Sequence, residues 1–245
     1  MSRRPSPRKT HLPKDISILY EDNHVLVVVK PAGLLTMGTE RDKSRTLYAM
    51  LTDYVRKGSP RSANRIFIVH RLDRDTSGIL IFAKTMETKL LLQDHWEETE
   101  KKYAAVVHGR CTEKKRTITT HLAENKAHFV YSTTDTAQGK LSRTSYRVIK
   151  AAGEFSLLEV DLLTGRKHQI RVHLAGIGHP VVGDAKYGME KGTCKRLALH
   201  ARAISFTHPV SGQRLAFETA IPEYFYSLVR SGKQRDMHLK TTSNR

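Results

Sequence analysis

The sequence has very little cysteine, and its apolar runs are short. The two cysteines among 245 residues are Cys111 and Cys194, so the sequence predicts neither a disulfide framework nor a zinc cage, and a reducing compartment fits. The longest purely apolar run near the N-terminus is Val25–Val29, far shorter than the ~20 residues that span a bilayer. The N-terminus also lacks the apolar core of a signal peptide. We therefore expect a soluble, cytoplasmic protein with no membrane partner.

Acidic residues are scarce relative to basic ones. The chain has 42 lysines and arginines against 24 aspartates and glutamates, which gives a formal net charge of +18 at pH 7. Because 27% charged and 39% hydrophobic residues are ordinary proportions for a globular protein, the surplus belongs to a folded chain. A strongly positive field attracts polyanions, and the commonest large polyanions in cells are nucleic acids, RNA in particular. The alternative is a basic protein whose charge only aids solubility.

The two ends of the chain are predicted to be basic flexible segments. Residues 1–13 contain four lysines or arginines, three prolines and no acid, a composition that cannot form a core. Residues 233–245 have a similar composition and are predicted to form a basic tail. A single domain is expected over residues 14–232, since no internal repeat or low-complexity segment divides it.

Within this domain the apolar patterns predict more strands than helices. They predict strands at residues 25–30, 66–70, 79–84, 103–109, 144–150, 155–162, 198–206 and 214–219. Helical spacing predicts helices near residues 47–55, with Ser44 as the N-cap, 86–98 and 167–175. Many strands with few helices favour an α+β fold, with a mixed, largely antiparallel sheet core and flanking helices.

The segment VHRLDRDTSGILI, residues 69–81, places two aspartates at a turn between two β-type runs. Asp, Thr, Ser and Gly favour a turn over residues 73–78, and a rigid sheet on either side would fix the side chains there. Two structural interpretations remain open. The aspartates and the threonine can bond to the amides of the turn. Alternatively, Asp75 pairs with Arg74 or Arg71 on a wet surface, which stabilises the fold little.

A metal site and an aspartic protease loop are chemical alternatives, and spacing disfavours both. Four residues of metal-binding type lie close together in the sequence: His168, His173, His179 and Asp184. The first two are five apart, which places them on different faces of a helix, unlike the i, i+4 pair of a zinc protease. Residues 75–78, DTSG, are similar to the aspartic protease loop, but a serine interrupts the pattern and only one copy exists where two are needed.

Several segments match the pattern of one known family. HRLDRDTSG at residues 70–78 is similar to its signature HRLDxxTSG. Further matching segments follow in order: YED (20–22), VVVKPAG (27–33), KKYAAVV (101–107), GKLSRTSY (139–146), LTGRKHQIRVHL (163–174), HP (179–180), GD (183–184), YG (187–188), LHA (199–201), FTHP (206–209) and Gly212. Together they resemble the RluA-type pseudouridine synthases over about residues 17–227.

Two features depart from the family pattern. Val29 stands where the family usually has an asparagine before Lys-Pro, which alters the polar edge of that turn. The chain also begins almost directly at the matching region, without the N-terminal S4-type RNA-binding module of many relatives. We therefore expect substrate selection to rest on the catalytic domain and its basic ends.

The resemblance implies a pseudouridine synthase fold that isomerises a uridine within RNA to pseudouridine, with no cofactor and no metal. Asp73 would be the catalytic residue, either by attack on the sugar or base or by proton abstraction, and each route needs the ionised carboxylate. Arg171 matches the arginine that pairs with this aspartate. Tyr103 matches the tyrosine that stacks on the target base. Arg71 matches the arginine that helps to flip the nucleotide.

The resemblance leaves other points open. Arg166 and His168 lie in the most specific motif and are expected to bind the RNA or to support the site. The RNA would be a large-subunit ribosomal RNA or a tRNA, and the protein a monomer. A non-catalytic RNA-binding or ribosome-assembly protein on the same fold is the alternative function. The joint presence of the aspartate, the tyrosine and the pairing arginine argues against it, because binding alone does not need all three.

Overall fold

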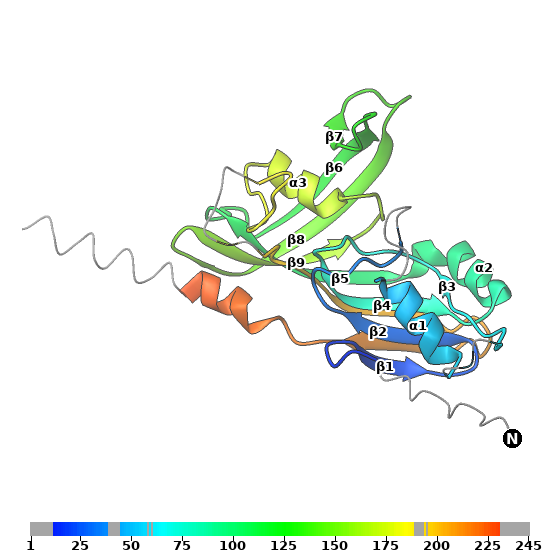
Figure 1. The fold of residues 1–245 in the computed structure, drawn as a ribbon. Coiled ribbons are helices and arrows are strands. Elements are labelled where there is room, and N and C mark those ends of the chain that lie inside the picture. Colours follow the sequence, from blue (N-terminus) through cyan, green and yellow to red (C-terminus); the bar gives the residue numbers. More distant parts are fainter. Residues whose placement is uncertain are drawn as a thin grey trace, which may run out of the picture. The chain divides into compact units, whose positions relative to one another are not determined.

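A computed structural model describes residues 12–38, 45–57, 59, 61–188, 194 and 196–230. The chain forms two compact units, one of residues 1–99 and 206–217 and the other of residues 100–205 and 218–245 (Figure 1). We describe each unit by itself. The predicted basic tail and all but residues 12 and 13 of the predicted basic arm lie outside the described residues, and the single domain over residues 14–232 stays a prediction.

The first unit is built on an antiparallel sheet. Its strands are β1 (Ser17–Glu21), β2 (Val25–Lys30), β3 (Phe67–Ile68), β4 (Ser77–Ala83) and β11 (Arg214–Glu218). The central pair β2 and β4 runs in register from Val25 opposite Ala83 to Lys30 opposite Gly78. All seven residues of β4 are buried, as expected for a strand whose apolar residues do not alternate with polar ones. This strand begins directly after the aspartate-bearing turn.

Two helices of the first unit begin at threonine caps. Helix α1 (Leu47–Val55) follows Thr46, whose side chain accepts a bond from the Ala49 N–H. Helix α2 (Met86–Asp94) follows Thr85, which caps it in the same way. Such caps satisfy backbone donors that the first turn of a helix leaves unpaired. The expected cap Ser44 lies outside the described residues, and the expected continuous helix to residue 98 is wrong, because α2 ends before a separate 3₁₀ turn, η1 (Trp96–Glu98).

The second unit contains a larger antiparallel sheet with the strand order β10-β5-β9-β8-β6-β7. The bounds are β5 (Glu100–His108), β6 (Lys115–Glu124), β7 (Val130–Thr133), β8 (Lys140–Ala152), β9 (Phe155–Leu162) and β10 (Leu199–Thr207). Helix α3 (Gln169–Gly176) packs beside β6, β7 and β8 (Figure 1). Residues 223–230 are also helical. No helix in the described ranges is long and apolar enough to cross a membrane.

The α+β class with a largely antiparallel sheet is confirmed, although three strands were not predicted. Strands β1, β6 and β7 lack a clear apolar alternation; β6, for example, buries Ile118 and Leu122 within a run of lysine, arginine and threonine. Strand β3 has two residues where five were expected. Such strands form because neighbouring strands supply hydrogen bonds and bury their side chains. A local sequence pattern does not show these neighbours.

A buried histidine ties α3 to the sheet of the second unit. His173 is 1% exposed, and its ring nitrogens lie 3.0 Å from Thr120 Oγ1 on β6 and 2.9 Å from Thr144 Oγ1 on β8. Burial lowers the pKa of His173 to about 4. The ring is therefore neutral at pH 7, where one nitrogen donates and the other accepts.

We expect this histidine to make the fold acid-sensitive. Because its pKa is near 4 in the folded protein and about 6.5 in an unfolded chain, the unfolded state binds more protons between these values, and the free energy of unfolding falls by at most about 3 kcal/mol as the pH drops through this window. Urea denaturation at pH 7 and pH 5 measures the loss. His173→Gln should lose less unfolding free energy between pH 7 and pH 5 than the wild type loses. His121→Gln changes a half-buried histidine of β6 and should lose as much as the wild type. Equal losses in all three proteins would contradict the assignment.

Candidate active site

The aspartate-bearing turn is a loop between β3 and β4 in the first unit. Asp73 is half-buried, and Arg71, two residues earlier, is exposed. The Thr76 N–H donates to the Asp73 carbonyl at 3.2 Å and closes the turn. Thr76 itself is 2% exposed, and β4 begins at the next residue. The predicted turn between two strands is thus present, and its aspartate projects from the edge of a rigid sheet.

Residues 30–36 hold this loop through its backbone. Thr36 Oγ1 donates to the Leu72 carbonyl at 2.9 Å. The Gly33 N–H and the Lys30 Nζ both donate to the Arg74 carbonyl, each at 2.9 Å. The carbonyls before, at and after Asp73 are therefore all hydrogen-bonded, and the carboxylate is presented from a fixed main chain.

Lys30 is completely buried beneath the loop. Its Nζ lies 2.9, 2.8 and 2.9 Å from the carbonyl oxygens of Pro31, Leu34 and Arg74. Three acceptors match the three N–H donors of an ammonium group. Burial lowers the pKa of Lys30 to about 8, against the opposing effect of the Asp75 and Asp73 carboxylates. The group therefore keeps its proton at pH 7 and uses all three hydrogens to hold two chain segments together.

The residues just before the loop are held by α2 and η1. Gln93 Nε2 donates to the Val69 carbonyl at 3.0 Å. The ring of His70 lies on that of Trp96, with 4.6 Å between centroids, and its Nε2 accepts a bond from the Ile81 N–H of β4 at 3.1 Å. The histidine of the HRLD segment thus has a structural contact on each side.

Asp75 forms a surface ion pair, as one of the structural interpretations predicted. Arg74 Nε and Nη2 lie 3.0 and 3.2 Å from its two carboxylate oxygens. The two side chains are 62% and 50% exposed, so water screens the pair and it stabilises the fold little. The exposed ion pair accounts for the Asp75 carboxylate within the loop itself.

The second unit contains the tyrosine and the pairing arginine that the sequence singles out. Tyr103 lies on β5 opposite Val160 of β9 and Ala201 of β10, and it is 8% exposed. Arg171 lies on α3 and binds Asp184 with two bonds, Nε to Oδ2 at 2.7 Å and Nη2 to Oδ1 at 2.8 Å. Such bidentate pairs fix both the position and the plane of a guanidinium.

Asp184 is the buried partner of this pair. Its side chain is fully buried and that of Arg171 is 11% exposed. Burial by itself would raise the pKa of Asp184, but the Arg171 guanidinium and the backbone N–H groups of Lys186 and Tyr187 lower it below the usual value. The Arg171 guanidinium also lies 5.1 Å from the centre of the Tyr187 ring, so charge and packing orient it together.

The loop before α3 places the two remaining predicted residues. His168 has a left-handed backbone (φ 53°), and its Nδ1 lies 2.8 Å from the Tyr187 hydroxyl. Arg166 is exposed, and its N–H donates to Gln169 Oε1 at 3.0 Å. Gln169 is 2% exposed and also bonds Thr164 and β8, which orders the loop. His168 therefore contacts Tyr187, while Arg166 lies at the surface.

The four residues of metal-binding type make separate contacts. His168 lies against Tyr187, His173 between two threonines, His179 against the His108 carbonyl, and Asp184 against Arg171. In the part of the chain that the structure describes, no group of three or more metal-ligand side chains could hold an ion.

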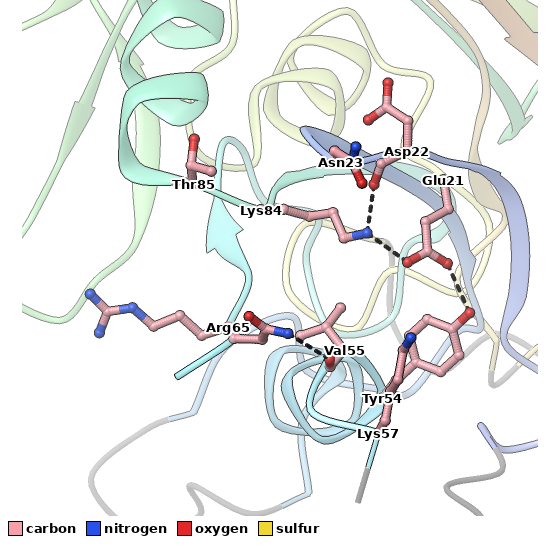
Figure 2. Close-up of a pocket in the computed structure, with 10 residues that line it drawn as sticks. Glu21, Asp22, Asn23, Tyr54, Val55, Lys57, Arg65, Lys84 and Thr85 are labelled. Carbon is pink, nitrogen blue, oxygen red and sulfur yellow. Dashed lines mark hydrogen bonds and ion pairs between the residues drawn. The ribbon is translucent and has the colours of Figure 1, made fainter. Parts of the chain in front are cut away.

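A polar pocket of about 660 Å³ lies elsewhere in the first unit (Figure 2). Figure 2 shows Lys84 directed toward Glu21 and Asp22, with its Nζ 2.7 Å from Glu21 Oε1 and 2.5 Å from the Asp22 carbonyl. Glu21 also accepts a bond from the Tyr54 hydroxyl at 2.8 Å. Lys84 follows the end of β4, whereas the aspartate loop enters its beginning. The pocket therefore contains none of the predicted site residues.

The structure thus assigns the six predicted residues to two groups. Asp73 and Arg71 belong to the first unit, and the other four belong to the second: Tyr103, Arg166, His168 and Arg171. Sequence reasoning did not single out Lys30 as a support of the loop, and it assigned Asp184 to a possible metal cluster. The sequence indicates the role of Lys30 only by placing a lysine at the end of an apolar strand. It does not indicate the Arg171–Asp184 pair, because the two residues are thirteen positions apart.

Comparison with known proteins identifies the family. The sequence model described as RNA pseudouridylate synthase matches residues 24–176. The chain belongs to this family. It is 36% identical to ribosomal large subunit pseudouridine synthase D of Nitrosomonas europaea (88% of this chain, 65% of that protein) and 32% identical to tRNA pseudouridine synthase C of Haemophilus ducreyi (87% and 94%). The structure of human RNA pseudouridylate synthase domain containing 1 superposes with a TM-score of 0.70 at 28% identity, covering 85% of this chain and 84% of that one.

These matches confirm the RluA-type family predicted from the motifs. The protein is an RNA pseudouridine synthase, an isomerase, and this catalytic function is better supported than the binding-only alternative. The family match spans β2 to α3 and includes both the aspartate loop and the Arg171 helix.

We expect Lys30→Met to impair this pseudouridine synthase at the loop. The change keeps the side-chain length but removes the Nζ donor from three carbonyls, of which that of Arg74 keeps its bond from the Gly33 N–H. The free energy of unfolding should therefore fall by about 1–3 kcal/mol, and turnover at saturating RNA should fall at least about tenfold. Lys84→Met is the matched control, because it removes a half-buried lysine and its ion pair at the other end of β4. Similar loss of turnover in both variants would contradict a specific role for Lys30.

A second prediction compares the two arginine–aspartate pairs. A double-mutant cycle with Arg171→Gln and Asp184→Asn should give a coupling energy of at least about 2 kcal/mol, because removing one member leaves a buried charge uncompensated. The cycle with Arg74→Gln and Asp75→Asn should give less than about 1 kcal/mol, because that pair is exposed. Chemical denaturation of the variants measures both, and equal coupling energies would refute the contrast.

Proposed function

We propose that the protein converts specific uridines of a structured RNA to pseudouridine with Asp73 as the essential catalytic residue. The observation that supports this most is the loop itself: a half-buried carboxylate on a main chain whose carbonyls are bonded by Lys30, Gly33, Thr36 and Thr76. Catalysis needs a carboxylate held in one position, since small displacements cost large factors in rate. Asp75, with its exposed partner, has no such constraint.

The reaction breaks the bond between N1 of uracil and C1′ of ribose and forms a bond between C5 and C1′. C5 loses its proton and N1 regains one, so the product is an isomer of the substrate. Asp73 acts on the sugar or base as a nucleophile, or as a base that abstracts a proton, and each role requires the ionised form. No cofactor and no metal is part of this proposal.

Arg171 and Tyr103 are proposed to complete the site. Arg171 would pair with Asp73 and favour its ionised form. Its two bonds to Asp184 use Nε and Nη2, and because an arginine has five N–H donors, a second carboxylate is chemically compatible with them. Tyr103 would stack on the uracil, which permits rotation of the base because stacking needs no fixed hydrogen-bond register.

Three further residues are proposed to bind the RNA. Arg71 is exposed beside the loop and would occupy the place of the flipped nucleotide. Arg166 would bind a phosphate from the exposed loop before α3. His168 would support the site through Tyr187, which lies against Arg171.

The substrate is proposed to be a large-subunit ribosomal RNA or a tRNA. Relatives in Nitrosomonas europaea and Haemophilus ducreyi are named for these two classes. The net charge of +18 supports a large polyanionic substrate. We further propose a cytoplasmic monomer whose catalytic domain spans residues 14–232, with basic segments at both ends that add phosphate contacts.

Tritium release from RNA labelled at uridine C5 tests this proposal. Ribosomal RNA and tRNA are offered separately to the wild type, to Asp73→Asn and to Asp75→Asn. The wild type should release tritium from one RNA class, and Asp73→Asn should reduce turnover by at least about 10³-fold, because the amide is neither nucleophile nor base. Asp75→Asn, in the same loop, should keep turnover within about threefold, because it breaks only an exposed ion pair.

Binding measured by filter retention separates catalysis from affinity. Asp73→Asn should bind the RNA about as tightly as the wild type, since phosphate contacts dominate affinity. Equal activity of Asp73→Asn and the wild type would refute the assignment of the catalytic residue. Tight binding of both RNA classes without release from either would favour the binding-only alternative.

A further inference from the structure

The outward face of α2 is apolar where a surface helix is usually polar. Thr88 and Leu92 are 2% and 4% exposed and face the core. Leu90 lies two residues from each of them, which at 3.6 residues per turn directs it to the opposite side of the helix. It is 58% exposed, and Met86, one turn earlier, is 46% exposed. Leu91, at 38%, extends the apolar surface sideways.

Helix α2 lies beside β3 and β4 (Figure 1), and its inward side chains and Gln93 make the contacts to that sheet and to Val69. An amphipathic surface helix places charged or polar residues on the side away from the core. Met86 and Leu90 occupy those positions instead and, at 46% and 58% exposure, leave adjacent apolar surface in contact with water.

The segment that contains this face carries a charge opposite to that of the whole protein. Residues 86–100 contain five acidic residues and one lysine, within a chain of net charge +18. Five exposed side chains supply this negative charge: Glu87, Asp94, Glu97, Glu98 and Glu100. Leucine and methionine do not stack on bases, and carboxylates repel phosphates. RNA is therefore an unsuitable occupant of this face.

We propose that this α2 face, formed by Met86, Leu90 and Leu91 with Glu87 and Asp94, docks a basic protein segment that presents apolar side chains. Apolar contact would supply affinity, and the surrounding carboxylates would attract and orient the basic partner. A symmetric contact with a second copy of this chain would bring the same patch against itself and so oppose like charges. Charge complementarity therefore favours a different, basic partner, beyond the RNA substrate of the enzyme.

Binding of defined peptides to the full chain tests the proposal. The probe is a fluorescein-labelled amphipathic peptide of about 18 residues, made of leucine at helical spacing and lysine elsewhere. A second peptide has glutamate in place of each lysine. Fluorescence anisotropy at physiological salt compares the wild type with Leu90→Lys, Leu90→Asp and Ile149→Lys. Ile149 is a matched control, because it is an apolar residue of β8, 43% exposed, in the other unit.

Leu90→Lys should weaken binding of the basic peptide at least about tenfold, because it removes an apolar contact and adds a like charge. Leu90→Asp should weaken it less, and Ile149→Lys should change it less than about twofold. All three variants should keep the thermal midpoint and the RNA turnover of the wild type, because both side chains are exposed and neither belongs to the proposed active site.

Equal weakening by Leu90→Lys and Ile149→Lys would overturn the proposal, as would tighter binding of the acidic peptide. Sedimentation velocity of the proteins alone tests for a second copy: a wild-type dimer that Leu90→Lys dissociates would show self-association and would also overturn it. Weaker RNA binding by Leu90→Asp, with turnover reduced in parallel, would assign the face to the RNA instead.

Discussion

The buried ammonium of Lys30 is the interaction on which the loop of the proposed catalytic aspartate depends. One completely buried charge binds three carbonyl oxygens, two in the turn that follows its own strand and one in the residue after Asp73. A buried cation is costly unless each of its donors is paired, so this arrangement permits little movement of either segment. The KPAG turn and the HRLD loop are consequently one structural element, although the bonded residues Lys30 and Arg74 are 44 positions apart in the sequence.

Burial separates ion pairs that look equivalent in the sequence. Arg171 and Asp184 are almost inaccessible to water, and the pair fixes the guanidinium of a proposed active-site residue. Arg74 and Asp75 are adjacent and largely exposed, and their pair has little effect on stability. An arginine–aspartate pair therefore fixes the position of the guanidinium where the pair is buried, and it has little structural effect where the pair is exposed. Burial also determines the contact of α3 with its sheet, where the neutral His173 ring is hydrogen-bonded between two threonines.

The two sides of helix α2 have different contacts. Its inner side and the following turn hold Val69 and His70 at the entrance of the catalytic loop. Its outer side exposes methionine and leucine among carboxylates, within an otherwise basic enzyme. The proposed docking face therefore differs in charge from the chain as a whole, and its chemistry suits a basic protein rather than an RNA phosphate backbone.

The sequence by itself determined the family, the α+β class and most of the longer strands, because motif order and continuous apolar runs are local properties of the chain. It also indicated the turn that presents Asp73, since Asp, Thr, Ser and Gly favour turns wherever they occur. Only the tertiary structure decided which partners are buried. The pairing of β6 with β8, the contact of Lys30 with the Arg74 carbonyl and the pairing of Arg171 with Asp184 all join residues that are not neighbours in the sequence. The energies of these contacts depend on how far each group is removed from water and on the distance between segments, and a local sequence pattern predicts neither.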